Sequence, residues 1–274
     1  MAKICFIVGH GKSKTGGYDS GAVSGKYHEF KIAKEIAKYA QEYYNKNYNE
    51  TADLMNYNGD LYLSDRIKKV NASDYDFIAE FHLNAGGGTG TECYYYHGST
   101  KGQKYADKIC DYIAEDLGVK QRPNGTDKDG GDKVKLTASG SDYFGIIRQT
   151  KPTAVLIETV FIDTKADLNK VETTSGQKKC GEAIAKAVAE VRGLTNKSST
   201  STTPTVTKPT VKYFKKYTGK SSSIVDALKS IGASNTFSYR KKIASANGIK
   251  AYIGTATQNT KLLNLLKQGK LIMP

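Results

Sequence analysis

Apolar residues up to about residue 194 fall into two kinds of pattern. Three short runs, 4–8, 77–81 and 154–157, are mainly apolar throughout, which is typical of strands buried on both faces of a sheet. Longer segments repeat apolar residues every three to four positions, as amphipathic helices do. Strands that alternate with helices predict an α/β fold, with a mixed, mostly parallel sheet flanked by helices. The helical segments are 29–45, 61–70, 105–117 and 181–191.

Weaker sequence patterns predict further strands and a loop in the rest of this region. The segments 51–57, 91–96 and 144–147 are expected to be strands. Asp60 stands just before the second helical segment, where aspartate is a common N-terminal cap. The stretch 122–142 is polar and rich in glycine, so we expect a long surface loop close to the functional site.

A run of Ser, Thr and Pro separates this region from the end of the chain. Residues 195–211 carry too little apolar surface to offset the entropy of ordering them, which predicts an extended linker. The linker divides a first domain, 1–194, from a second domain, 212–274. The second domain contains three amphipathic segments, so we expect it to be small and mainly helical. These segments are 222–232, 238–246 and 260–266.

Positive charge is concentrated in the second domain. The whole chain carries a formal net charge of +14, and from Lys212 to Pro274 twelve Lys and Arg residues stand against the single Asp226. Residues 1–194 are therefore close to neutral. A basic module of this kind favours a polyanion or an anionic surface, which leaves nucleic acid and an anionic cell-wall polymer both open as partners.

The sequence also bears on where the protein is made. No stretch approaches the roughly 18 to 20 apolar residues of a membrane-spanning helix, and Met1 leads into the first apolar run without the layout of a signal peptide. We therefore expect synthesis in the cytoplasm, no membrane insertion, and release by other machinery. Cys5, Cys93, Cys110 and Cys180 form no close pair, which predicts buried free thiols rather than a thiolate zinc cluster or a disulfide framework.

Residues suited to metal binding or proton transfer follow the apolar runs. His10, His82 and Glu158 each come at the end of one run, and ligand sites in open α/β sheets lie beyond the carboxyl ends of strands. Glu29 opens the first helical segment. Two histidines and one glutamate bind zinc with one coordination place left for water, and a second carboxylate beside that water can take its proton.

Each of these residues also has a purely structural interpretation. A histidine at the end of a strand is more often hydrogen-bonded within the fold than bound to metal, and Glu29 suits the dipole of the helix that it opens. Glu158 is harder to explain in this way, because a carboxylate that ends an apolar run is costly to bury unless something binds or protonates it. Asp19 is a competing ligand in the first loop, whereas His28 and His97 are expected to lie outside the site.

The spacing of these residues matches a known pattern. The segments are VGHG at 8–11, DSGA at 19–22, Glu29, FHLNA at 81–85, and RQTKPTAVLIE at 148–158 followed by Phe161. In order and spacing they resemble the zinc-dependent N-acetylmuramoyl-L-alanine amidases of bacterial autolysins and phage endolysins. The resemblance extends along almost all of the first domain. One departure is that Lys12 follows Gly11, where a His-Gly-Gly loop is commoner.

This resemblance implies the role of each residue. His10, Glu29 and His82 would hold Zn²⁺, and Glu158 would be the catalytic carboxylate. The substrate would be the amide between the lactyl group of N-acetylmuramic acid and L-alanine in peptidoglycan. Water would attack this amide while Glu158 takes the proton of the water and passes it to the leaving amine. Arg66 falls where the family carries an arginine, and we expect a supporting role for it.

The second domain resembles LysM glycan-binding modules in one respect. The sequence Ala-Asn-Gly-Ile at 246–249 precedes a terminal Gly-Lys-Leu-Ile-Met-Pro at 269–274. In combination with the resemblance of the first domain, this predicts a cell-wall-binding domain. Its positive charge suits teichoic acid or another anionic wall polymer.

Three functions compete at this level. The first is a phage endolysin that reaches the peptidoglycan of its host after the membrane has been permeabilised. The second is a bacterial autolysin, or a sporulation or prophage amidase, with the same chemistry. The third is a non-catalytic protein that binds the cell wall or another polyanion, which the basic second domain favours but the four residues at strand and helix ends do not. Because those four residues favour a wall amidase, we do not expect nucleic acid as a partner.

Overall fold

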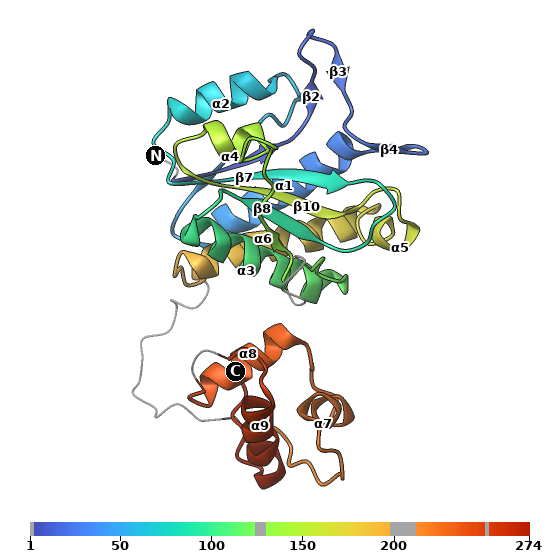
Figure 1. The fold of residues 1–274 in the computed structure, drawn as a ribbon, viewed down its shortest axis with the longest axis vertical. Helices are drawn as coiled ribbons and strands as arrows, with labels where there is room; N and C mark the ends of the chain where they lie inside the picture. The colour runs from blue at the N-terminus through green and yellow to red at the C-terminus, as the bar shows by residue number, and fades with distance from the viewer. Residues whose placement is uncertain (1–2, 124–129, 198–211, 250–251) are drawn as a thin grey trace. The chain divides into compact units, whose positions relative to one another are not determined.

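The computed structural model describes residues 3–123, 130–197, 212–249 and 252–274 (Figure 1). The chain forms two compact units, Met1–Ser201 and Thr202–Pro274. Most of the predicted linker, 195–211, lies outside the described residues, so its extended conformation stays a prediction.

The first unit is built on a six-stranded sheet in the order β6-β1-β7-β10-β8-β9. β1 pairs in parallel with both β6 and β7, and β10 pairs in parallel with β7. β8 is antiparallel to β10, and β9 is parallel to β8. The predicted mixed, mostly parallel sheet is therefore confirmed. The strands are β1 (Ile4–Val8), β6 (Ala52–Met55), β7 (Phe77–Asn84), β8 (Glu92–Tyr95), β9 (Asp132–Lys133) and β10 (Thr153–Phe161).

Helices cover both faces of this sheet (Figure 1). α1 (Glu29–Asn47), α3 (Thr100–Leu117) and α6 (Thr174–Val191) pack on one face, where they bury a large apolar cluster that includes Phe6, Phe77 and Phe81. α2 (Leu63–Asn71) and α4 (Gly145–Gln149) lie on the other face over a smaller cluster. This burial on both sides explains why β1, β7 and β10 read as mainly apolar runs.

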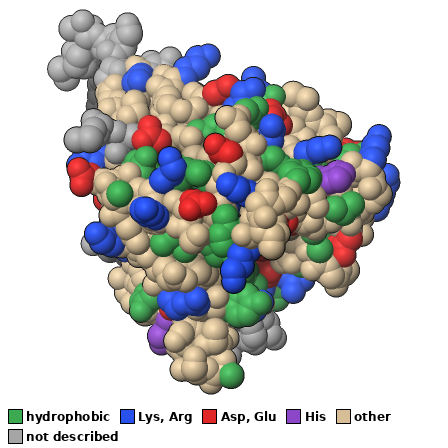
Figure 2. Space-filling model, turned by 90° about the horizontal axis from the view of Figure 1, so that it is seen from above, with side chains coloured by type: hydrophobic (Ala, Val, Ile, Leu, Met, Phe, Trp, Pro, Cys, Tyr) green, Lys and Arg blue, Asp and Glu red, His purple; other side chains and the backbone are tan. Residues whose placement is uncertain are grey.

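Shorter elements complete the unit. Two small hairpins precede α1: β2 (Gly11–Lys12) with β3 (Tyr18–Asp19), and β4 (Val23–Ser24) with β5 (Tyr27–His28). α5 (Lys165–Leu168) follows β10. Figure 2 views the side of α2 and the β2–β3 hairpin, and its Lys and Arg side chains are scattered among acidic and apolar ones. That distribution agrees with the near-neutral charge of the first domain.

Two local predictions were wrong. The segment 144–147 is not a strand, because Ile146 and Ile147 belong to the short helix α4 and are buried against the second face of the sheet. A short apolar run cannot be assigned to strand or helix by periodicity alone. Asp60 does not cap α2, whose N-terminal cap is Tyr62. Instead the side-chain oxygen of Asn56 accepts the backbone N–H of Leu61 and shapes the turn before the helix.

The second unit contains three helices among its described residues. α7 (Ile224–Ser230), α8 (Phe237–Ala246) and α9 (Ala256–Gln268) surround one apolar core, and an isolated bridge joins Tyr213 to Ile272. Ser223 caps α7, since its hydroxyl accepts the N–H of Asp226. The mainly helical character is confirmed, whereas the resemblance to LysM modules stays a prediction.

None of the helices in the described part of the chain is long and apolar enough to span a membrane. All four cysteines are free and buried, as predicted. Burial raises the pKa of the Cys93 and Cys110 thiols well above the usual value, so these groups are packing residues rather than reactive thiolates.

Candidate active site

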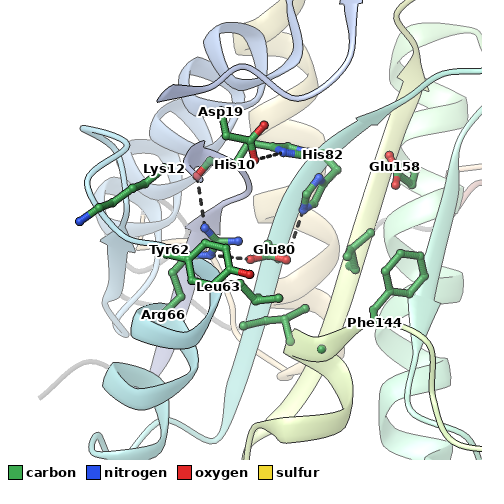
Figure 3. A pocket seen from close by; sticks show the side chains of 13 residues that line it. His10, Lys12, Asp19, Tyr62, Leu63, Arg66, Glu80, His82, Phe144 and Glu158 are labelled. Atoms are coloured by element: carbon green, nitrogen blue, oxygen red, sulfur yellow. Dashed lines mark hydrogen bonds and ion pairs between the residues drawn. The ribbon is translucent and has the colours of Figure 1, made fainter. Parts of the chain in front are cut away.

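The predicted site residues converge at the carboxyl end of the central strands. His10 lies two residues beyond β1, while His82 in β7 and Glu158 in β10 are directly paired in the sheet, so their side chains share a face. Together they line a pocket of about 300 Å³ on the face that carries α2 and α4 (Figure 3). Phe144 and Leu156 form part of its apolar wall.

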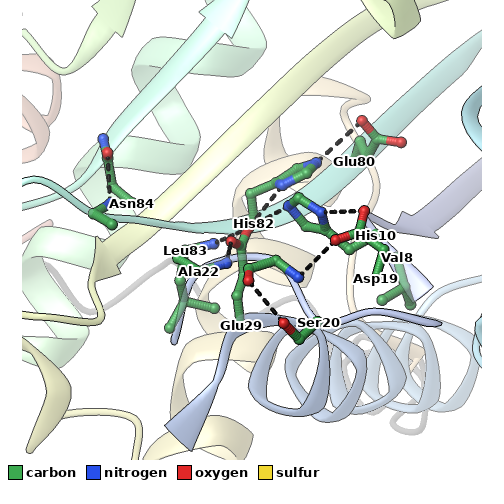
Figure 4. A network of polar contacts seen from close by, with 12 residues as sticks. Val8, His10, Asp19, Ser20, Ala22, Glu29, Glu80, His82, Leu83 and Asn84 are labelled. Atoms are coloured by element: carbon green, nitrogen blue, oxygen red, sulfur yellow. Dashed lines mark hydrogen bonds and ion pairs between the residues drawn. The ribbon is translucent and has the colours of Figure 1, made fainter. Parts of the chain in front are cut away.

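Glu29 brings the two histidines together. Its Oε1 atom lies 3.1 Å from His10 Nε2 and 2.8 Å from His82 Nδ1 (Figure 4). One donor atom from each of these three residues lies within 4.8 Å of the other two, as the ligands of a single ion require. Burial opposes ionisation of Glu29, but its hydrogen bonds with the two histidines outweigh it and hold the pKa of the carboxyl well below its usual value.

The other nitrogen of each histidine also faces a carboxylate. His10 Nδ1 lies 2.9 Å from Asp19 Oδ2, and His82 Nε2 lies 3.2 Å from Glu80 Oε2. Histidines that ligate metals usually donate their second N–H to such an oxygen, which fixes the tautomer and the ring. Two imidazoles so oriented and one carboxylate fit a zinc ion. Asp19, the competing ligand, therefore lies behind His10 rather than within the donor set.

Close backbone packing keeps the donor set compact. His10 has a positive φ of 60°, and Gly21 lies so near that an added Cβ would come within 2.6 Å of Glu29 Oε2 and 2.8 Å of His10 Cδ2. Glu29 is also held by the backbone, because Oε2 accepts the N–H of Ala22 at 2.8 Å and Oε1 that of Leu83 at 3.1 Å. The glycine-rich loop thus lets the chain pass tightly around the three residues of the donor set.

Substitution of Gly9 tests this packing directly. A Cβ at this position would stand 2.2 Å from the His82 ring, so Gly9→Ala should displace His82 and destabilise the metal-free protein by about 1–3 kcal/mol. Gly17→Ala is the matched control in the same loop, because its nearest atom is Ser13 Oγ at 3.5 Å, and its effect should stay within about 0.5 kcal/mol. Urea denaturation of both variants measures the difference. Equal stabilities would contradict the proposed crowding.

Glu158 lies next to the donor set but outside it. Its side chain is half-buried, and its Oε2 atom is fully buried without a hydrogen-bond partner. Burial raises the pKa of Glu158 to about 7; His82 opposes this shift, while the negative charges of Glu29 and Glu92 add to it. A carboxylate with an unpartnered oxygen and a pKa near neutrality is suited to accept and return a proton.

Sequence reasoning missed two buried carboxylates around this group. Glu92 in β8 pairs directly with Glu158 across the sheet and is bound by Arg122 at 2.8 Å and by Lys133. Glu80 lies two residues before His82 on the same face of β7. The sequence offered one sign of such a residue, which is that Glu80 interrupts the otherwise apolar run 77–81. His28 and His97 lie outside the donor set, as predicted.

The raised pKa of Glu158 predicts a pH-dependent stability. A carboxyl whose folded pKa lies above its unfolded value of about 4.3 stabilises the fold when protonated, and this contribution is lost as the pH rises through about 7. The metal-free protein should therefore lose stability relative to Glu158→Gln between pH ~5 and pH ~8. Urea denaturation of both proteins at these pH values measures the difference. A difference that does not change with pH would contradict the shift.

Comparison with known proteins agrees with this geometry. The chain is 29% identical over 202 residues to the sporulation-specific N-acetylmuramoyl-L-alanine amidase of Bacillus subtilis, and the match covers 73% of this chain and 71% of that protein. It is 30% identical over 217 residues to the endolysin of Bacillus phage SPP1, and this match covers 76% of this chain and 73% of the endolysin. The solved catalytic domain of the CD27L endolysin targeting Clostridia difficile has a TM-score of 0.54 and 29% identity, over 69% of this chain and 98% of that one. Residues 4–190 match the family of N-acetylmuramoyl-L-alanine amidases, so this chain is a member of that family.

Proposed function

We propose that this peptidoglycan amidase uses a zinc ion held by His10, Glu29 and His82, and that Glu158 transfers the proton. The amide that it hydrolyses joins N-acetylmuramic acid to L-alanine. The observation that carries the proposal is the convergence of three metal donor atoms, two of them from His10 and His82, which line a pocket together with Glu158 and its unpartnered carboxylate oxygen.

The metal ion and Glu158 have separate roles in the proposed reaction. A zinc ion bound by the three donors would polarise the amide carbonyl and make water more acidic. Glu158 accepts the proton of the attacking water at its unpartnered Oε2 and passes it to the leaving amine of L-alanine. Phe144 and Leu156 provide an apolar wall of the pocket on the side of Glu158 that faces α4.

The decisive experiment uses purified cell wall as the substrate. The enzyme should release new amino ends that are identified as L-alanine, without an increase in the reducing ends of the glycan. A chelator should abolish the release, and Zn²⁺ should restore it. Full activity after exhaustive chelation would overturn the metal proposal, and new reducing ends would indicate cleavage of a different bond.

We also propose that the protein acts as a phage endolysin. It would be made in the host cytoplasm and would reach the wall once the membrane is permeabilised. A bacterial autolysin or a sporulation amidase is the alternative, and the two relatives described above represent both kinds of protein. The genes next to this one distinguish them: a neighbouring gene for a membrane-permeabilising protein supports the endolysin.

For the second unit we propose binding to the cell wall, with an anionic polymer such as teichoic acid as the ligand. The twelve basic residues between Lys212 and Pro274 support this, because one acidic residue, Asp226, opposes them.

Deletion of residues 212–274 should weaken sedimentation with purified walls and leave the zinc content unchanged. Both forms are compared in a Glu158→Gln background, so that digestion of the wall does not release the bound protein. Walls stripped of their anionic polymer should retain less of the full-length protein. Equal sedimentation of the truncated and full-length proteins would contradict a binding role for the second unit.

A further inference from the structure

Glu80 is an unusual residue for the centre of a sheet. It lies in β7 with 2% of its surface exposed, between strands β1 and β10. Its two oxygens have different partners: Oε2 lies 3.2 Å from His82 Nε2, and Oε1 accepts the Nε–H of Arg66 at 3.0 Å (Figure 3). In the metal-free protein both ring nitrogens of His82 therefore face a carboxylate, Nδ1 that of Glu29 and Nε2 that of Glu80. A proton held on Nε2 by Glu80 would leave Nδ1 to bind a metal once Nδ1 has given up its own proton.

Arg66 connects this carboxylate to the other histidine. The guanidinium comes from α2 and is 4% exposed. Besides Glu80, it donates from Nη1 to the carbonyl oxygen of His10 at 3.2 Å and to that of Leu61 at 3.0 Å. His10 needs such support because its φ of 60° is strained for a residue with a side chain. One arginine therefore contacts the segments that carry both histidines.

Stability of the fold is a poor explanation for this buried ion pair. Removing two charges from water costs about as much as their attraction returns, and apolar residues of similar volume often replace such a pair without loss. On this face α2 and α4 pack over an apolar cluster that includes Ile7, Ile78 and Leu156. An apolar pair, however, would provide neither an acceptor for His82 Nε2 nor a donor for the His10 carbonyl.

We propose that Arg66 and Glu80 are positioning residues for the metal centre, which hold His82 in its metal-binding tautomer and His10 in its strained backbone conformation. The proposal rests on the proposed zinc site. It predicts that both residues contribute to zinc affinity although neither is a ligand. Hydrogen-bonded carboxylates behind metal-binding histidines typically change metal affinity by about 10–100-fold.

The test is a zinc titration of purified full-length variants in competition with a chromophoric chelator. Glu80→Gln should weaken zinc binding by about 10–100-fold. Glu50→Gln is the matched control, because it also breaks a largely buried pair with an arginine, Arg192, but one with no contact to the histidines. The control should keep the affinity of the wild type. Equal affinities for Glu80→Gln and Glu50→Gln would overturn the proposal.

A second variant separates positioning from folding. Glu80→Gln leaves the Arg66 charge buried without its partner, which itself destabilises the protein. The double substitution Arg66→Met with Glu80→Leu removes both charges and should fold with near-native stability, yet its zinc affinity should stay low. A folded double variant with wild-type zinc affinity would overturn the proposal.

The tautomer gives an independent measurement. Nitrogen-detected NMR of the zinc-loaded protein should find the His82 proton on Nε2 in the wild type, with its signal broadened or lost in the double variant. An unchanged Nε2–H signal in the double variant would count against a role for Glu80. If the wild type itself binds no zinc, the proposed function fails, and that result is distinct from a failure of the positioning role.

Discussion

Replacing Glu158 by glutamine should lower the rate of amide hydrolysis by about 10²–10⁴-fold, the usual contribution of a general acid and base. The substitution keeps the shape of the side chain but removes its capacity to accept a proton. Zinc should remain bound, because Glu158 lies outside the three-residue donor set. The expected result is thus an enzyme with a full metal content and little turnover.

Release of L-alanine amino ends and elemental analysis of the same preparation measure both halves of this result. Glu50→Gln serves as the control, since it removes a carboxylate whose partners are Arg192 and Tyr44 rather than groups of the pocket. Near-normal turnover by Glu158→Gln would refute the catalytic assignment. Loss of zinc from that variant would instead make Glu158 part of the metal site.

The position of Glu158 shows why part of the site could be predicted from the sequence. In a parallel sheet the carboxyl ends of strands meet at one edge, so polar residues that end apolar runs are brought together by the topology alone. His10, His82 and Glu158 follow this rule. Glu29 obeys a related one, since it opens a helix and its side chain reaches the same edge.

The residues that surround the site could not be predicted in this way. Glu92 lies opposite Glu158 only because β8 runs antiparallel beside β10. The local pattern of apolar and polar residues predicts neither this pairing nor its register. Glu80 needs Arg66 from α2, 14 positions away, to be tolerated in the sheet. The segment 144–147 formed a helix for a similar reason, because tertiary packing decided between two conformations that suit a short apolar run.

His10→Ala should abolish stoichiometric zinc binding and, with it, hydrolysis. The variant removes one of three donors and leaves Glu29 and His82, too few for a closed zinc site. A ligand that binds only the folded state stabilises it, so wild type should gain about 2.7 kcal/mol of stability at a zinc concentration one hundred times its Kd. His10→Ala should gain almost none. His97→Ala is the control, since it removes an exposed histidine outside the donor set.

Thermal denaturation with and without zinc, together with elemental analysis, measures this difference. A full zinc complement in His10→Ala would show that another group replaces it, and Asp19 is the first candidate because its carboxylate bonds His10 Nδ1 and lies outside the donor set. The double substitution of His10 and Asp19 by alanine would then be expected to release the metal. Zinc retained even in that variant would place the metal centre elsewhere in the protein and would remove the support for Glu158 as its neighbouring base.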